Sequence, residues 1–367
     1  MPFSDFSEED IEEYGDLIKT VCALSRMFSE SSKPYMDYRL AENIFCRCFR
    51  AENLARSDCS IDARIGSFGV GIKTFASNSS QKIAEFNKDR EIYRDLNYED
   101  AVRKISELRN GRIEFTKRTY GVDSVYYHCL IRQEGTVLIS ECPMETVDTD
   151  SISEVKSKGN TIQFTDGIES YSFNISKSTL YKTFGCTPLK TVDIEILEDP
   201  FASLRNILTF SGTAIAQPVP EKPFVILPLF SVRNRNKIVP EKSGLNQWNA
   251  GGRKRAPDEV YIPIPSRVHK EKPDFFPPRD TVFTLRLPDG VSFLSAKVCQ
   301  DGEKALMTNP NLALGQWILR KVLNVQEGQL VTYGTLETAG ANAVRIEKNG
   351  DLDYSIDFTY LEHPDLW

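Results

Sequence analysis

Short apolar stretches, interrupted by prolines, glycines and charged residues, fill the last third of this 367-residue chain. Within each stretch apolar and polar side chains tend to alternate, which is typical of β-strands. The stretches lie at 225–232, 260–265, 281–287 and 291–298. One helix is expected at 312–322, soon after the Asn309-Pro310 dipeptide. Many short strands with one or two helices favour a small barrel for this part of the chain.

The first half of the chain has a mixed pattern, in which helical spacing and strand alternation follow one another. The predicted helices cover 7–30, 36–55, 80–89 and 97–108, a β-hairpin covers 62–74, and strands fill about 112–175, beginning at 113–115. Prolines at 218, 220 and 223 interrupt the pattern, which indicates a boundary within 215–224. We therefore expect an α/β domain at 1–220, with a mixed sheet flanked by helices, and a strand-rich domain at 221–367.

Composition indicates an ordinary soluble globular protein, with 40% hydrophobic and 26% charged residues. No apolar run reaches the roughly 18 residues that a membrane span needs. The first 16 residues carry seven acids and no Lys or Arg, the reverse of a signal peptide. The eight cysteines form no Cys-x-x-Cys pair, so we expect free thiols in a reducing compartment and no zinc site. These observations predict a cytoplasmic protein.

Charge is distributed unevenly along the chain. The net charge is −7, which does not suit a binder of nucleic acid. Residues 231–255, however, carry seven basic groups against the single acid Glu241, and such a patch attracts polyanions even on an acidic protein. The basic groups are Arg233, Arg235, Lys237, Lys242, Arg253, Lys254 and Arg255. A solvated loop is the alternative interpretation.

Two acids and a lysine on adjacent predicted elements of the first half can hold a hard divalent cation and orient a water against a phosphodiester. Asp62 enters the predicted hairpin and Lys73 lies on its returning strand. Glu85 lies on the helix expected next, with Gln81 one turn earlier on the same face. Mg²⁺ takes one or two carboxylates and keeps other positions for water and phosphate oxygens, so we expect Asp62 and Glu85 to hold it. Lys73 would orient the attacking water or stabilise charge on the phosphorus.

Each of these residues also has an interpretation without catalysis. Asp62 could be a turn residue, Lys73 an edge-strand lysine that discourages aggregation, and Glu85 a solvated acid on a helix. His128, within a predicted strand, is expected to be a satisfied core histidine.

Asp62 and Lys73 resemble the core of the PD-(D/E)XK nuclease superfamily. The residue two positions before the lysine is normally acidic there, whereas this chain has Gly71. Several type II restriction endonucleases show the same departure and carry the second acid on the next helix. Glu85, 12 residues after Lys73, has the spacing of that relocated acid. These enzymes also carry a glutamate on an earlier helix, for which Glu42 is the candidate.

Four segments of the second half carry a more specific resemblance. They read SGLNQWNAGGRKRAPDEVYIPIP at 243–265, ALMTNPN at 305–311, LGQWILRKVL at 314–323 and TYGTLE at 332–337. They resemble the C-terminal domain of a restriction-endonuclease family whose N-terminal half is a phospholipase-D-like nuclease. The resemblance covers roughly 221–367 and implies the DNA-binding pseudobarrel shared with plant B-three transcription factors, which grips the major groove with two arms.

The first half departs from that family. The phospholipase-D nuclease needs a His-x-Lys motif, which neither His128 nor His269 begins. The DNA-reading domain is therefore expected to be joined to a different, metal-dependent nuclease.

Two polar segments are the expected arms, because amides can bind base edges while arginine and lysine suit guanine or phosphate. The first arm offers Asn246, Gln247, Trp248, Asn249, Arg253, Lys254 and Arg255, with Lys242 as a phosphate contact. The second offers Ser295, Lys297, Gln300, Lys304, Thr308 and Asn309. For Trp248 a packing anchor that shapes the arm is preferred over base contact, and Trp317 is expected in the core.

The expected function is that of a type II restriction endonuclease, which hydrolyses phosphodiester bonds of double-stranded DNA with Mg²⁺. Two strands need two cuts and each chain has one predicted site, so a homodimer is expected. A companion DNA methyltransferase would protect host DNA in a bacterial or archaeal cytoplasm. Two alternatives remain open: a nuclease that depends on modified bases, and a non-cleaving DNA-binding regulator with a degenerate nuclease fold.

Overall fold

The computed structural model describes residues 3–55, 59–76, 80–185, 187–211, 222–234 and 236–361. These residues separate into two compact units. The first unit comprises the described residues within Met1–Arg56, Ser60–Ile113 and Val122–Gln217. The second unit comprises the described residues within Ser57–Cys59, Glu114–Gly121 and Pro218–Trp367. The limits 1–220 and 221–367 stay a prediction. Arg235 and the prolines at 218 and 220 lie outside the described residues.

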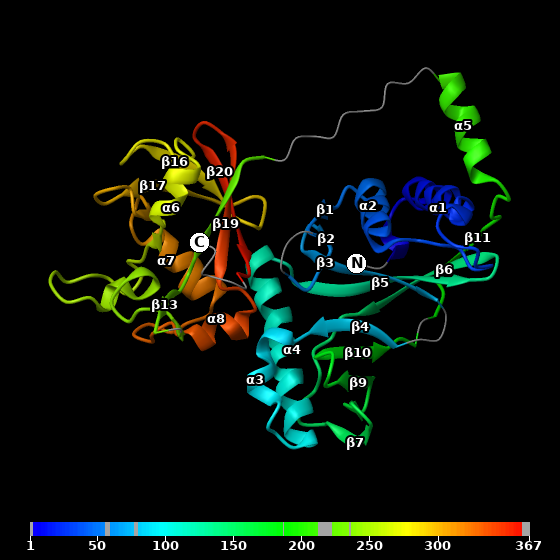
Figure 1. Cartoon of the computed structure of the whole chain (residues 1–367), viewed down its shortest axis with the longest axis horizontal. Helices are drawn as coiled ribbons and strands as arrows, with labels where there is room; N and C mark the ends of the chain where they lie inside the picture. The colour runs from blue at the N-terminus through cyan, green and yellow to red at the C-terminus, as the bar shows by residue number, and fades with distance from the viewer. Residues whose placement is uncertain are drawn as a thin grey trace. The chain divides into compact units, whose positions relative to one another are not determined.

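A mixed six-stranded sheet is the framework of the first unit (Figure 1). Its strands, in spatial order, are β1 (Glu52–Asn53), β2 (Ala63–Ile65), β3 (Phe68–Ala76), β5 (Ser124–Gln133), β6 (Thr136–Pro143) and β11 (Lys190–Asp193). Strands β3 and β5 are parallel, and the other neighbours are antiparallel. The hairpin predicted at 62–74 is confirmed by the β2–β3 pair, whose turn uses Gly66 at φ +56°.

Two helices, α1 (Glu8–Ala23) and α2 (Tyr38–Cys48), pack on this sheet through one apolar core. Ser7 caps α1 by accepting the N–H of Asp10, and Asp37 caps α2 by accepting the N–H of Arg39. Both helices are shorter than predicted. The turns η1 (Phe3–Asp5) and η2 (Ser25–Met27) flank α1, and β1 follows α2.

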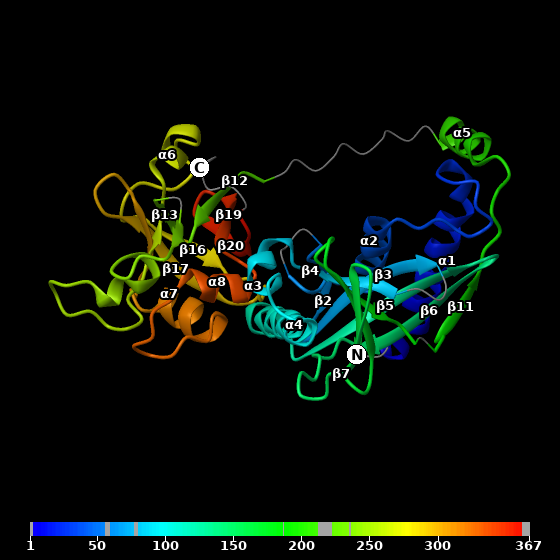
Figure 2. The same cartoon turned by 60° about the horizontal axis from the view of Figure 1, so that its bottom comes forward.

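An antiparallel five-stranded sheet forms the rest of the first unit. Its order is β4 (Ser80–Glu85), β10 (Thr179–Thr183), β9 (Ser170–Asn174), β8 (Thr161–Thr165) and β7 (Ser153–Lys158). The long helix α4 (Tyr98–Tyr120) lies beside it (Figure 2) and buries Val102, Ile105 and Leu108 in the same core as Phe173 and Leu180. The remaining elements are η3 (Asn87–Asp89), α3 (Arg90–Tyr93) and α5 (Pro200–Ser211).

Two sequence-based assignments are wrong. The helix expected at 80–89 is strand β4, which pairs with β10, followed by the short turn η3. Apolar spacing over so few residues does not separate helix from strand, and here the pairing with a distant strand decides. The strand expected at 113–115 is part of α4, where Ile113 and Phe115 are both buried.

The second unit is built on a seven-stranded sheet. Its order is β12 (Phe224–Pro228), β19 (Ala343–Gly350), β20 (Asp353–Thr359), β16 (Val282–Arg286), β17 (Phe293–Cys299), β18 (Ala305–Thr308) and β15 (Ile262–Pro263). Strands β16 and β20 are parallel, and all other neighbours are antiparallel. The end strands β12 and β15 contact each other, so the sheet nearly closes. The expected small barrel is thereby confirmed.

Short helices and a hairpin complete the second unit. They are β13 (Ser231–Arg233), β14 (Asn236–Ile238), η4 (Gly244–Asn249), α6 (Ser266–Glu271), α7 (Ala313–Gly315), the π-helix η5 (Gln316–Val322) and α8 (Tyr333–Ala339). Elements α7 and η5 confirm the helix predicted at 312–322, and Trp317 is buried as expected. Phe115, near the end of α4, belongs to this core, and its ring centroid lies 5.3 Å from that of Phe358.

Cys22, Cys46, Cys48 and Cys299 are free thiols in the structure. Burial raises the pKa of Cys22 and Cys46 to about 12, so both thiols act as neutral packing groups. In the described ranges we find no helix with the length and apolar character of a membrane span.

Candidate functional site

Three charged residues from successive elements of the first unit form a cluster. Glu42 lies on α2, Asp62 directly precedes β2, and Lys73 lies on β3. Electrostatic interactions link Glu42 to both other residues, and Asp62 to Lys73. Because such interactions weaken with separation, the three head groups lie near one another. The fold thus brings together three of the five residues expected at the active site.

Backbone hydrogen bonds fix Asp62 at the mouth of the hairpin. Its N–H donates to the carbonyl of Val70 at 2.8 Å, and its carboxylate Oδ2 accepts the N–H of Ile72 at 2.7 Å. Burial raises the pKa of the Asp62 carboxyl, while the charge of Lys73 and the Ile72 N–H partly offset the rise. The strand that carries Lys73 therefore also orients the carboxylate of Asp62.

Glu42 is a buried acid, with 4% of its surface exposed. Burial is the main reason that the pKa of Glu42 is raised to about 7, the negative charge of Asp62 adds to the rise, and the charges of Arg39 and Lys73 partly offset it. Arg39 Nη1 donates to Glu42 Oε2 at 3.1 Å. Two neighbouring carboxylates, of which Glu42 is buried and Asp62 partly buried, fit a hard divalent cation, because carboxylate oxygens are its preferred protein ligands.

Lys73 lies beside an aromatic ring that a second lysine also approaches. Its Nζ is 5.9 Å from the ring centroid of Tyr127 on β5, and Lys182 Nζ on β10 is 5.8 Å from the same centroid. Arg109 Nη2 on α4 donates to the Tyr127 hydroxyl at 2.6 Å. Lys182 also forms an ion pair of 2.7 Å with Glu169. None of Tyr127, Lys182 and Arg109 was singled out from the sequence.

Gly71 stands where the superfamily normally has an acid, and the structure gives a packing reason for glycine. Gly71 pairs in register with Tyr127 across β3 and β5. A Cβ atom at position 71 would lie 2.6 Å from the side-chain methyl of Met144 and 3.4 Å from the Tyr127 ring. An acidic side chain at this position would require Met144 to move.

Glu85 and Gln81 lie on strand β4, so the expected helical face does not exist. The Glu85 carboxylate accepts hydrogen bonds from Lys82, at 3.0 Å, and from Asn87. The hydrogen bond from Lys82 is the main reason that the pKa of Glu85 is lowered. Gln81 is the cross-strand partner of Lys182, the lysine beside Tyr127. A metal role for Glu85 stays a prediction.

Within the described residues, no three His, Cys, Asp or Glu side chains converge to hold a metal ion. A site of one or two carboxylates with water and phosphate oxygens, as Mg²⁺ uses, is compatible with this arrangement. His128 is fully buried, with Nε2 3.0 Å from the Tyr14 hydroxyl and Nδ1 2.9 Å from Glu141 Oε1. It is the satisfied core histidine that was predicted.

Two amides of the expected first arm are buried in the fold. Asn246 is fully buried: its Nδ2 donates to the carbonyl of Val331 at 2.8 Å, and its Oδ1 accepts the N–H of Val331 at 2.9 Å. Gln247 is also buried and lies 3.4 Å from Glu259 Oε1. Both amides hold the base of the arm. Trp248 packs partly buried against the core, as the preferred interpretation predicted.

The arginines of this arm are held by a buried acid that sequence analysis missed. Glu259, 3% exposed, forms an ion pair with Arg253 and lies 3.8 Å from Arg255 Nε. Glu259 lies four residues beyond the basic segment 231–255, so the charge balance of that segment did not include it. Lys242, Asn249 and Lys254 are exposed, and Asn249 Nδ2 donates to the carbonyl of Glu241.

The expected second arm is similarly divided. Thr308 is buried, and its hydroxyl accepts the N–H of Leu314. Lys297 forms an ion pair of 2.8 Å with Asp280. The side chains that remain exposed are Gln300, Lys304 and Asn309.

Comparison with known proteins covers the second unit. Residues 226–349 match the family described as the NgoFVII C-terminal B3-like DNA-binding domain, a domain of a restriction enzyme. The match agrees with the nearly closed sheet and confirms the resemblance expected for this part of the chain. No curated protein matches the chain.

Proposed function

We propose that this protein is a sequence-specific endonuclease of double-stranded DNA, of the type II restriction class. The second unit binds DNA and the first unit, as a PD-(D/E)XK-type domain, hydrolyses it. The cluster of Glu42, Asp62 and Lys73 carries the proposal, because a buried Glu42 and a partly buried Asp62 beside a lysine are costly to maintain without a use. The restriction-enzyme domain matched by residues 226–349 supports DNA as the substrate.

Asp62 would hold the catalytic Mg²⁺, with Glu42 or Glu85 as the second acid. Burial of Glu42 and its interaction with Asp62 favour Glu42. When bound, the cation would neutralise charge on the phosphate and lower the pKa of a coordinated water. Lys73 would donate a hydrogen bond to the attacking water or to a phosphate oxygen, and Tyr127 would limit where its ammonium can lie.

Hydrolysis forms a bond between the water oxygen and phosphorus while the bond to one sugar oxygen breaks. One proton must leave the water, and one must reach the departing sugar oxygen. The carboxylates near Lys73 are available to accept the first proton. The positive charge of Lys73 stabilises the extra negative charge on the phosphate oxygens in the transition state.

DNA contact would use the exposed polar residues of the two arms. Lys242, Lys254 and Lys304 suit phosphate oxygens, while Asn249 and Gln300 can reach base edges. Arg253 and Arg255 would contact DNA only by rearranging their interaction with Glu259. Cutting both strands would use a homodimer, and a companion methyltransferase would protect host DNA.

The test is incubation of the purified chain with several plasmid DNAs, with Mg²⁺ and with EDTA. Discrete bands only with Mg²⁺ are expected. DNA that is retarded but never cut would indicate a regulator instead, and cleavage only of plasmids from a methylating host would indicate dependence on modified bases.

Four variants test the proposed roles of the individual residues in cleavage: Asp62→Asn, Lys73→Met, Glu42→Gln and Glu85→Gln. The first three should abolish cleavage and leave DNA retardation unchanged. Glu85→Gln separates the two candidates for the second acid, because it should cut normally if Glu42 holds the cation. Glu91→Gln, at an exposed acid of α3, is the matched control. Normal cleavage by Asp62→Asn would contradict the proposed active site.

A further inference from the structure

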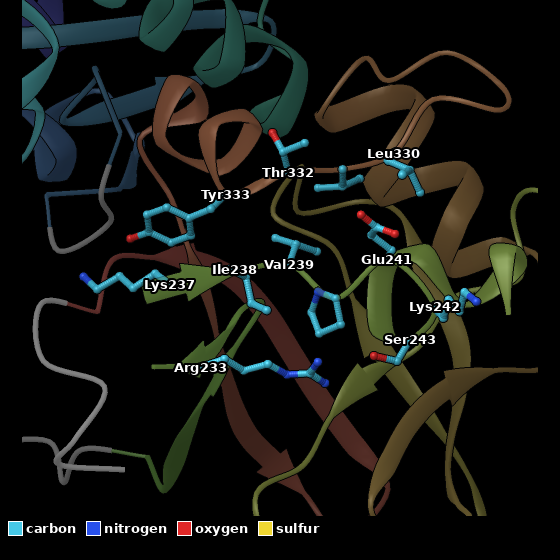
Figure 3. Close-up of a pocket in the computed structure, with 12 residues that line it drawn as sticks. Arg233, Lys237, Ile238, Val239, Glu241, Lys242, Ser243, Leu330, Thr332 and Tyr333 are labelled. Carbon is cyan, nitrogen blue, oxygen red and sulfur yellow. The ribbon is translucent and has the colours of Figure 1, made fainter. Parts of the chain in front are cut away.

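A pocket of about 700 Å³ lies in the second unit, between the segment that follows β13 and the segment that leads into α8 (Figure 3). Tyr333 and Leu330 stand on opposite sides of it, with Val239 between them. The volume lies within the range of sites for small organic ligands, about 300–1,000 Å³. The pocket shares Lys242 with the proposed DNA-binding surface.

The pocket has an apolar floor and a charged rim. Its lining includes three cations, Arg233, Lys237 and Lys242, and one acid, Glu241, so it favours an anionic ligand. Arg233 extends along one side, and the amino groups of Lys237 and Lys242 lie at opposite ends (Figure 3). A ligand with an apolar body and a negatively charged group would match both parts.

The aromatic wall of the pocket is firmly held. Asn342 Nδ2, in a fully buried side chain, donates to the Tyr333 hydroxyl at 3.2 Å. The Tyr333 ring packs edge-on against Phe230, with centroids 5.3 Å apart. Lys237 Nζ lies 5.8 Å from the Tyr333 centroid. A flat aromatic ligand could therefore stack on a preorganised ring beside a cation.

We propose that this pocket takes one nucleotide, with its base against the Tyr333 ring and its phosphate at Arg233. Within the proposed function, on which this inference rests, the nucleotide belongs to DNA and its base is turned out of the helical stack. A free mononucleotide offers the same chemistry from another source, and the experiment distinguishes the two.

The full chain is titrated in EDTA into a labelled duplex with one mismatched base pair, and into the fully paired duplex of the same sequence. Since a mismatch lowers the cost of extruding a base, a pocket for an extruded base predicts roughly tenfold tighter binding to the mismatched duplex. A second titration uses deoxynucleoside 5′-monophosphates. If mononucleotides bind with a dissociation constant below about 1 mM and the mismatched duplex is not preferred, the pocket is assigned to a free nucleotide.

Two variants locate the effect. Leu330→Trp fills the pocket, and Arg233→Ala removes an exposed cation with little cost to folding. Both should lose the mismatch preference or the mononucleotide binding. Val291→Trp and Lys270→Ala change exposed residues outside the pocket lining and should keep them.

Two results would overturn the inference: wild-type protein that shows neither effect, or pocket variants that keep both. Either result leaves the proposed function standing if plasmids are still cut with Mg²⁺. Conversely, absence of cutting defeats the proposed function, while the titrations in EDTA still report on the pocket.

Discussion

At the scale of single residues, Glu42 shows how a buried acid can oppose stability. Its pKa of about 7 lies above the ordinary value of 4.5 because the fold disfavours its charged form. Between these two values the folded protein holds more protons than the unfolded chain, so this residue makes stability fall as pH rises. Above about pH 7 the full penalty is present.

Glu42→Gln should therefore raise the melting temperature at pH 8 in EDTA, and the gain should shrink toward pH 5. Thermal unfolding followed by circular dichroism checks the effect. Mg²⁺ added at pH 8 should stabilise the wild type and not the variant, because ligand binding to the folded state adds stability. A variant less stable than wild type at pH 8 would show that the Arg39 contact outweighs the buried charge.

Two asparagines three positions apart in the first arm should behave differently. Asn246→Ala leaves the buried N–H and carbonyl of Val331 without their partner, so we expect it to destabilise the second unit by about 3 kcal/mol. Asn249→Ala removes an exposed side chain and should change stability by less than about 0.5 kcal/mol. Tryptophan fluorescence during urea unfolding reports both values. Equal stabilities would mean that the Val331 clamp is dispensable.

At the scale of elements, the helix that begins with α7 supports the base of the first arm. Gly315 packs directly on the backbone of Asp258: an added Cβ would lie 2.0 Å from the Asp258 carbonyl oxygen. Arg320 lies on η5. Its Nε donates to Asp258 Oδ1 at 2.7 Å, and its Nη2 donates to the carbonyl of Pro257. The position of the arm is thus coupled to this helix.

Gly315→Ala should cost at least about 2 kcal/mol and also weaken DNA binding, since a backbone atom must move to admit the methyl group. Gly251→Ala is the matched control, because nothing lies within 4 Å of its added Cβ. Urea unfolding and a gel-shift titration measure the two effects. Retained DNA affinity in a destabilised Gly315→Ala protein would show that the arm does not depend on α7.

What sequence could predict follows from how local each interaction is. The β2–β3 hairpin joins residues that are close in the sequence, so its glycine turn and its alternating pattern predict it correctly. The hairpin in turn predicts that Asp62 and Lys73 lie close together. Strand β4 depends on β10, about a hundred residues later, and was mistaken for a helix. Asn246 looked free to bind DNA because its partner Val331 is 85 positions away. Pairing between residues that are far apart in the chain produces no local sequence pattern.

At the scale of the whole molecule, α4 contributes to the cores of both compact units. Its first part, with Ile105, packs in the core of the five-stranded sheet, while Glu114–Gly121 belongs to the second unit. In the second unit Arg118 Nε donates to the carbonyl of Val322, and Tyr120 donates to Asp357. A fragment that begins at residue 221 would therefore lack part of its own core.

Phe115→Ala should destabilise the second unit by about 3–5 kcal/mol, although position 115 lies about a hundred residues before Pro218–Trp367, the largest segment of that unit. The side chain is 2% exposed and packs on Phe358, so its removal leaves a cavity in the barrel core. Tryptophan fluorescence reports this unit, because Trp248 and Trp317 both lie in it. Ile105→Ala changes a fully buried position of the first unit. It should leave the midpoint of the fluorescence transition unchanged and lower the midpoint of the unfolding transition followed by circular dichroism. An unchanged fluorescence midpoint in Phe115→Ala would show that the second unit folds without the end of α4, and the fragment from 221 onward should then be as stable as the same unit in the full chain.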